Sequence, residues 1–194
     1  MKKRLFAKCK TWVLTVGVLY SLPLTGQAQA PTINWDVTIG GKEKDVLNSF
    51  ALTEDKGYIA GGTSTSGKSG EKGDESRGKE DYWVVKLDDR GRVEWERTYG
   101  GEDKDELGSV RPVKGGYIVG GTSLSNSGKG VEKEQDSKGG SDYWVLKLNE
   151  RGDIEWQRTI GGDKDDQLAI VLETRDGGYI VGGTSASPKS GAKS

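Results

Sequence analysis

Apolar and polar residues alternate along much of this chain with the period of two that is typical of β-strands. In residues 93–99 one face carries a Val, a Trp, an Arg and a Tyr, and residues 154–160 repeat the pattern with closely related side chains. Residues 81–87 are apolar on both faces, as in a strand that is covered on both sides. No stretch beyond residue 30 shows a helical period. The pattern therefore predicts an all-β protein.

One sequence unit occurs three times. Trp35, Trp95 and Trp156 are separated by 60 and 61 residues, and each begins one of the phrases WDVTIGGKEKD, WERTYGGEDKD and WQRTIGGDKDD. Each phrase is followed by GYIAGGTS or GYIVGGTS and then by a long hydrophilic segment. DYWVVKLDDRG closes the first of these segments and DYWVLKLNERG the second. Recurrence at a fixed period predicts a repeat architecture.

Each unit is predicted to contain four antiparallel strands, about eleven in the chain. Residues 88–91 and 149–152 begin with an acid or an amide and end in Gly, as tight turns do. A four-stranded meander cannot cover both of its faces, so neighbouring units must stack. Radial stacking would make the units blades of an incomplete β-propeller, the architecture that we expect. A linear β-solenoid or a tandem sandwich is the alternative.

The repeated phrases W-x-R-T-[IY]-G-G, G-G-Y-I-V-G-G-T-S and D-Y-W-V-[VL]-K-L resemble the tandem repeats of large secreted or surface-exposed proteins of Bacteroidota-type bacteria. The resemblance covers residues 31–194. It implies a propeller-like β fold, export and, in many such proteins, a C-terminal sorting domain. It implies no catalytic residue.

The N-terminus has the features of a cleavable secretory signal. Five basic residues lie within the first ten, and residues 11–24 form an apolar run that is short for a membrane span. Cleavage is expected after Ala28, which divides the chain into a signal peptide, residues 1–28, and a β-repeat region, residues 29–194. We therefore expect a secreted or cell-surface protein; an uncleaved membrane anchor is the alternative.

Composition limits the chemistry of the mature chain. The signal contains the only Cys of the chain, Cys9, and the only Met, Met1. It also contains five of the 29 basic residues and none of the 30 acidic ones, so the mature chain has 24 basic and 30 acidic residues and a net charge of −6. The protein has no His. Thiolate nucleophiles, Ser-His-Asp triads, zinc sites with N or S ligands and disulfides are thereby excluded. An acidic chain without a basic stripe also argues against nucleic acid as the partner.

Residues 61–70 contain a formal match to the P-loop pattern, with Gly62, Gly67, Lys68 and Ser69 at the required spacing. A phosphate-binding loop needs a helix after it, and the turn-rich residues 70–75 do not predict one. The other two copies of the segment lack the pattern. We therefore expect no nucleotide binding.

Acidic residues follow each Gly pair, and oxygen ligands of this kind are those that calcium prefers. The low-probability calcium ligands are Asp45, Asp103, Asp105, Asp163 and Asp165. Their order does not match an EF-hand loop. The favoured interpretation is that Asp45, Asp105 and Asp165 accept hydrogen bonds from backbone N–H groups in turns. No cofactor is expected on this reading.

The hydrophilic segments 65–80 and 124–141 are expected to be solvated and to emerge together on one face of a propeller. Aromatic residues at their ends could stack on a sugar: Tyr82, Trp83, Tyr143 and Trp144. Packing of these rings in the core is the favoured alternative.

The sequence thus predicts an exported, non-catalytic scaffold or binding module that takes an unknown protein or glycan ligand. The alternative is an accessory part of a carbohydrate-active enzyme whose catalytic region is absent from this chain. A fragment of a longer repeat protein, completion of the fold by self-association, and a remnant of a truncated gene also remain open.

Overall fold

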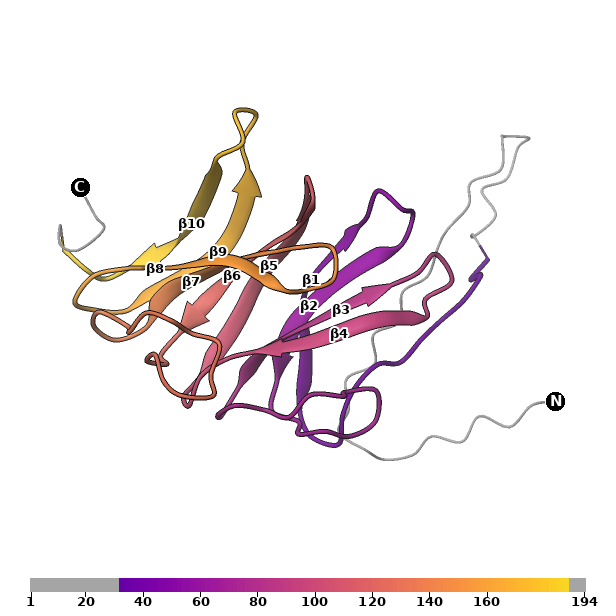
Figure 1. The fold of residues 1–194 in the computed structure, drawn as a ribbon, viewed down its shortest axis with the longest axis horizontal. Coiled ribbons are helices and arrows are strands. Elements are labelled where there is room, and N and C mark those ends of the chain that lie inside the picture. Colours follow the sequence, from indigo (N-terminus) through magenta and orange to yellow (C-terminus); the bar gives the residue numbers. More distant parts are fainter. Residues whose placement is uncertain (1–31, 189–194) are drawn as a thin grey trace.

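The computed structural model describes residues 32–188, and within this range the chain is all β, without a helix (Figure 1). The predicted signal peptide lies outside the described residues. The ten strands are β1 (Asp45–Leu52), β2 (Tyr58–Ser64), β3 (Asp81–Leu87), β4 (Val93–Tyr99), β5 (Asp105–Val113), β6 (Gly116–Ser123), β7 (Asp142–Leu148), β8 (Ile154–Ile160), β9 (Asp166–Glu173) and β10 (Tyr179–Ser185).

The strands form three antiparallel sheets in chain order. The first sheet is β1-β2-β3-β4, the second is β5-β6-β7-β8, and β9 pairs with β10 in the third. None of the sheets closes on itself. The prediction of tandem four-stranded antiparallel repeats is confirmed.

The boundary of the unit differs from the one read in the sequence. The phrase that begins with Trp95 forms β4, the last strand of the first sheet, and each new sheet begins after the following Gly pair. The first copy of the phrase, residues 35–39, forms no strand. This segment accounts for the difference between about eleven expected strands and the ten within residues 32–188.

The predicted turns close as their glycines require. Gly91 has a φ of 77° and Gly152 a φ of 85°, a region that side chains with a Cβ avoid. In the first of these turns the Asp88 carboxylate accepts hydrogen bonds from the backbone N–H groups of Arg90 and Arg92, at 2.9 and 2.8 Å. The turn residues thus fix the β3–β4 hairpin through local bonds.

The sheets stack face to face in chain order, and Figure 1 shows them side by side from β1–β4 to β9–β10. The core between the first and second sheets contains Ile59, Tyr82 and Val84 from one side and Leu107, Val119 and Trp144 from the other. The Tyr82 hydroxyl donates to the Trp144 carbonyl at 3.2 Å. A second core, around Ile118 and Val171, joins the second sheet to β9 and β10.

The repeated tryptophans have the same role in each unit. The Trp95 ring lies edge-on to Tyr117 of the following sheet, with ring centroids 5.7 Å apart. Trp35 lies 5.5 Å from Tyr58 in the same arrangement. Residues 35–39 therefore occupy, on the first sheet, the place that β4 occupies on the second.

Candidate functional site

The site that we consider is a hollow at the inner edge of the stack, where the first strands of all three sheets come together. It has a volume of about 360 Å³. Its lining is mostly polar and comes from β1, β2, β5, β6 and β9 and the segments beside them: Lys44, Val46, Asn48, Thr63, Glu80, Glu106, Leu107, Gly108, Thr122, Gln167 and Leu168. We call it the inner hollow.

Three of the lining residues occupy the same position of the repeat. Val46, Glu106 and Gln167 each follow the first residue of an inner strand. The backbone around them repeats from unit to unit, whereas the side chains are an aliphatic group, an acid and an amide. The fold therefore presents three different side chains from one repeated position.

The preceding aspartates fix this position. Asp45 accepts a hydrogen bond from the Gly41 N–H at 2.7 Å, and Asp105 accepts one from the Gly101 N–H at 2.8 Å. A serine hydroxyl donates to the same carboxylate oxygen, from Ser66 at 3.1 Å in the first unit and from Ser125 at 2.8 Å in the second. Each carboxylate thus ties the Gly pair to the end of the G-G-T-S-x-S segment.

In the third unit this role belongs to Asp166, not to Asp165 as the sequence suggested. Asp166 accepts hydrogen bonds from the Gly162 N–H and the Ser187 hydroxyl, both at 2.8 Å. Asp165 instead accepts a hydrogen bond from the Ser141 N–H at 3.0 Å. One extra residue between the second and third tryptophans moves the equivalent acid by one position.

Burial changes the acidity of one of these anchors. Asp105 is fully buried, and the loss of solvation raises its pKa to about 6, although hydrogen bonds from Ser123, the Gly101 N–H and Ser125 oppose the shift. All of these hydrogen-bond donors are groups of the same repeat unit, so we assign the Asp105 carboxyl a structural role.

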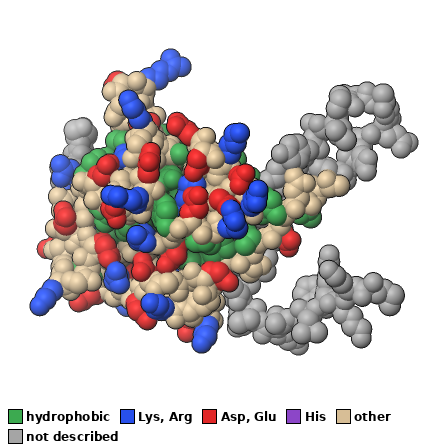
Figure 2. All heavy atoms as spheres, turned by 45° about the vertical axis from the view of Figure 1, so that its right-hand side comes forward, with side chains coloured by type: hydrophobic (Ala, Val, Ile, Leu, Met, Phe, Trp, Pro, Cys, Tyr) green, Lys and Arg blue, Asp and Glu red, His purple; other side chains and the backbone are tan. Residues whose placement is uncertain are grey.

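Ion pairs surround the inner hollow. The Lys104 ammonium lies 3.1 Å from Glu80 and 2.7 Å from Glu106, and Lys44 lies 3.7 Å from Glu80. Lys104 is 39% and Glu106 50% exposed, so these pairs contribute little to stability. They hold charges of both signs at the rim, where a polar ligand would meet them. Figure 2 shows acidic and basic side chains interspersed over the visible face.

The long segments 65–80 and 124–141 lie at the same end of their sheets and contact each other. Arg77 of the first donates two hydrogen bonds to Glu132 Oε1 of the second, at 3.0 and 2.8 Å. They were expected to be simply solvated. The structure instead attaches each of them to the sheets.

Two buried lysines, which the sequence analysis did not single out, anchor these segments. Lys72 donates to the Asp74 carbonyl at 2.8 Å and to the Thr98 hydroxyl at 2.7 Å. Lys133 donates to the Ser125 carbonyl at 2.6 Å and to the Ser123 hydroxyl at 2.8 Å. Both are 1% exposed, and burial lowers the pKa of each. Each hydrophilic segment contains three lysines, and nothing in the sequence distinguishes the buried one from the other two.

The four aromatic candidates lie at the ends of the long segments, and none of them lines the inner hollow. Tyr82 and Trp144 are fully buried between the first and second sheets, with ring centroids 5.1 Å apart. Tyr143 is half-buried beside β9 and β10, and Trp83 lies on the outer face of the first sheet. As placed, Tyr82 and Trp144 have no free ring face for a sugar.

The acidic candidates do not come together either. Asp45 and Asp105 lie in separate units and accept the hydrogen bonds described above, while Asp103 forms an ion pair with Lys79 at 2.8 Å. Asp163 and Asp165 lie near the third Gly pair. Within residues 32–188 no group of three or more acidic side chains is placed to hold a metal ion.

The segment with the P-loop pattern follows β2, and the next regular element is the strand β3. Glu75 accepts a hydrogen bond from the Lys68 N–H at 3.1 Å, which places an acid where phosphate would lie. In the part of the chain that the structure describes, no helix is long and apolar enough to cross a membrane.

Comparison with known proteins gives one weak similarity. The chain is 25% identical over 161 residues to the regulatory protein FlaEY of Caulobacter vibrioides. The match covers 80% of this chain but 17% of that protein, so the chain spans about a sixth of its relative's length. No family model matches the chain.

Proposed function

We propose that this protein is an exported, non-catalytic β-repeat module that binds a polar ligand, a glycan or a protein surface, outside the cell. The observation that carries the proposal is the inner hollow. A repeated, hydrogen-bonded backbone there presents Val46, Glu106 and Gln167 from equivalent positions, beside side chains of Asn48 and Thr122. Fixed backbone with variable side chains is the arrangement of a recognition surface.

The chemistry of the hollow favours a polyhydroxylated or peptide ligand. Its amide, hydroxyl, carboxylate and ammonium groups can both donate and accept hydrogen bonds. The carboxylates nearest to it, Glu80 and Glu106, are both paired with Lys104. This pairing supports a binding role over a general acid or nucleophile.

A propeller-type arrangement is part of the proposal. Each inner strand, β5 and then β9, packs against the preceding sheet, so the inner edges of successive sheets meet. Radial stacking of further units would place the inner hollow beside the axis, where propellers bind ligands.

Export is proposed from the N-terminal sequence, which lies outside the described residues. Mass spectrometry of the protein secreted by a bacterial host should give a chain that begins at Gln29. The regulatory name of the Caulobacter protein specifies no ligand, and the matched region is a small part of that protein. The similarity therefore suggests a module that serves a larger system.

The binding test uses the mature chain against panels of bacterial polysaccharides and surface proteins, followed by calorimetry with any hit. Glu106→Ala and Gln167→Ala should each weaken binding about tenfold, since each removes hydrogen bonds made within the hollow. Glu173→Ala, which changes an exposed acid at the other end of β9, is the matched control. Hydrolysis of a bound glycan that depends on Glu106 would instead favour the enzyme alternative.

A further inference from the structure

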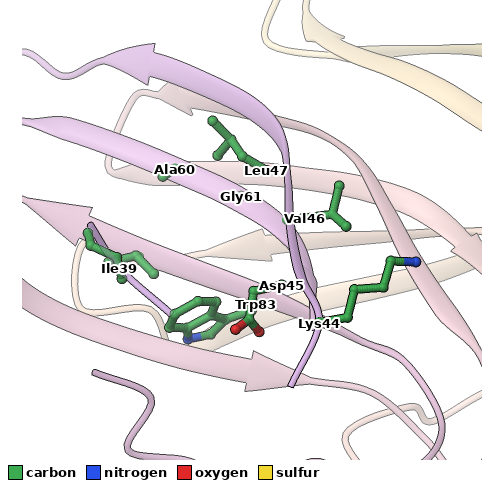
Figure 3. A pocket seen from close by; sticks show the side chains of 10 residues that line it. Ile39, Lys44, Asp45, Val46, Leu47, Ala60, Gly61 and Trp83 are labelled. Atoms are coloured by element: carbon green, nitrogen blue, oxygen red, sulfur yellow. The ribbon is translucent and has the colours of Figure 1, made fainter. Parts of the chain in front are cut away.

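The outer face of the first sheet carries an apolar hollow that no other sheet within residues 32–188 covers. Its volume is about 400 Å³, and Figure 3 shows Leu47, Ala60 and Trp83 among the side chains that line it. Most of its accessible lining is apolar. Residues 35–39 cover part of this face: Trp35 packs against Tyr58, and Ile39 lines the hollow beside Trp83 (Figure 3).

The stack itself shows what belongs on such a face. Trp144 and Leu107 of the second sheet occupy the repeat positions of Trp83 and Leu47, and the first sheet covers both of them. Leu107 is 1% exposed, whereas Leu47 is 43% exposed. The face of the first sheet that carries the hollow is thus equivalent to the face of the second sheet that the first sheet buries. On the first sheet this face is open.

The opposite end of the stack carries the complementary surface. Ile180 in β10 occupies the repeat position of Ile59 and Ile118, both of which are fully buried by the next sheet, yet it is 60% exposed. Ile170 and Leu172 in β9 are exposed beside it, at 39% and 43%. Exposed apolar groups that gather on one sheet face indicate an interaction surface.

A repeated hydrogen bond fixes the register between successive sheets. The Leu107 N–H donates to the Thr63 hydroxyl at 3.1 Å, and the Leu168 N–H donates to the Thr122 hydroxyl at 3.0 Å. Each bond joins the Thr of a G-G-T-S segment to the third residue of the next inner strand. Thr184 in β10 is the equivalent of Thr63 and Thr122, and Leu47 in β1 is the equivalent of Leu107 and Leu168. These two residues lie on the end faces of the stack.

We propose that a second copy of this chain docks head to tail, with the β9–β10 face of one copy on the β1–β2 face of the other. Ile170, Leu172 and Ile180 of one chain then lie against Leu47 and Phe50 of its partner. The Thr184 hydroxyl accepts the Leu47 N–H. The contact repeats the geometry of the two sheet interfaces already present in the molecule, which is why a second copy fits better than an unrelated partner.

Such a contact is heterologous, because it uses two different surfaces of the chain. An assembly built from this contact therefore keeps one free β1–β2 face and one free β9–β10 face at its two ends, unless the chains close into a ring. The inference goes beyond the proposed function: Leu47 and Ile180 do not line the inner hollow, and association does not depend on the ligand.

Sedimentation velocity of the mature chain over a range of concentrations tests the proposal. The average mass should rise above that of one chain as concentration increases. Leu47→Glu and Ile180→Glu should each weaken association by at least about tenfold, because each buries an unpaired charge at the contact. Leu124→Glu, at a residue that is 41% exposed and belongs to neither face, should associate as the wild type does.

Mixing the two variants identifies the kind of contact. Leu47→Glu retains its β9–β10 face and Ile180→Glu retains its β1–β2 face, so an equimolar mixture should form dimers and nothing larger. Circular dichroism checks that each variant is folded, and Ile170→Glu serves as a second variant of the β9–β10 face. A wild type that stays monomeric at all concentrations would overturn the proposal. So would association that only one of the two substitutions abolishes, since the contact would then join two identical faces.

Discussion

At the scale of single residues, the repeated aspartates show how one side chain can fix the start of a strand. Asp45, Asp105 and Asp166 each accept the N–H of the second glycine of a pair and the hydroxyl of a serine from the neighbouring strand's extension. Charge-assisted bonds of this kind satisfy donors that would otherwise be buried without a partner. The cost is the burial of a carboxylate in each unit.

Burial raises the pKa of Asp105 from 3.8 to about 6. The free energy of unfolding should therefore depend on pH through this residue. Between these two values the folded state binds more protons than the unfolded state, so the free energy of unfolding falls as pH rises through this window. The loss amounts to about 3 kcal/mol at most, at roughly 1.4 kcal/mol per pKa unit. The residue's contribution is most favourable below pH 4.

Thermal melts of Asp105→Asn and the wild type, at half-unit steps from pH 4 to pH 8, measure this pH-dependent contribution of Asp105 to stability. The melting temperature of the wild type should fall relative to that of the variant up to about pH 6 and then level off. Asp136→Asn, with its melts continued below pH 4, is the control of opposite sign: hydrogen bonds from Ser127 lower the pKa of Asp136 from 3.8, so its contribution is lost only as pH falls below that value. A difference between wild type and Asp105→Asn that does not change with pH would contradict the prediction.

At the scale of elements, the long segments between the second and third strands are ordered by lysines. The Lys133 ammonium donates to Ser123, Ser125 and Ser137 at 2.6 to 2.9 Å, all uncharged groups. Burial of a charge against neutral partners is unfavourable, as its lowered pKa shows, and the hydrogen bonds offset that cost. Through these three hydrogen bonds Lys133 stabilises the folded conformation of residues 124–141.

Replacing Lys133 by Met removes the donors but keeps an unbranched side chain. The acceptors left without a partner cost roughly 1–3 kcal/mol each, so we expect the segment to open. Cleavage by a glutamate-specific protease at Glu132 and Glu134 should become at least about tenfold faster. Lys138→Met, at an exposed residue of the same segment, is the matched control. Equal cleavage rates in the two variants would show that other contacts hold the segment.

The strands and turns could be predicted from the sequence because their signals are local. Alternation placed β4 and β8 correctly, and the acid or amide and Gly of residues 88–91 and 149–152 identified the hairpin turns. The phase of the unit could not be predicted, since a repeat has no first strand until pairing selects one. Residues 35–39 have the pattern of β4, but no strand among the described residues pairs with them.

The candidate site was less accessible to sequence reasoning. The inner hollow combines residues from three units, and nothing local marks Val46, Glu106 and Gln167 as facing one space. The aromatic residues beside the long segments looked suited to ligands, but the stacking of sheets buries Tyr82 and Trp144. Position relative to a neighbouring sheet, rather than residue type, decides these roles.

At the scale of the whole molecule, each sheet within residues 32–188 packs its face against the next sheet along the chain. One core joins the first and second sheets and another joins the second sheet to β9 and β10. In such an arrangement stability is close to a sum of the stabilities of the units and of their nearest-neighbour contacts. Within residues 32–188 the third sheet has only two strands and one neighbouring sheet, so it should open more readily than the four-stranded sheets before it.

Val171 provides the test, because it is fully buried between β9 and the second sheet. Val171→Ala should cost about 1–3 kcal/mol through lost contacts and the cavity left behind. Hydrogen exchange should then become faster in β9 and β10 while protection in β1–β4 is unchanged. Val110→Ala, an equally buried valine between the first and second sheets, should reduce protection in both of those sheets instead. If Val171→Ala speeds exchange equally in all ten strands, the stack unfolds as one cooperative body and the nearest-neighbour description is wrong.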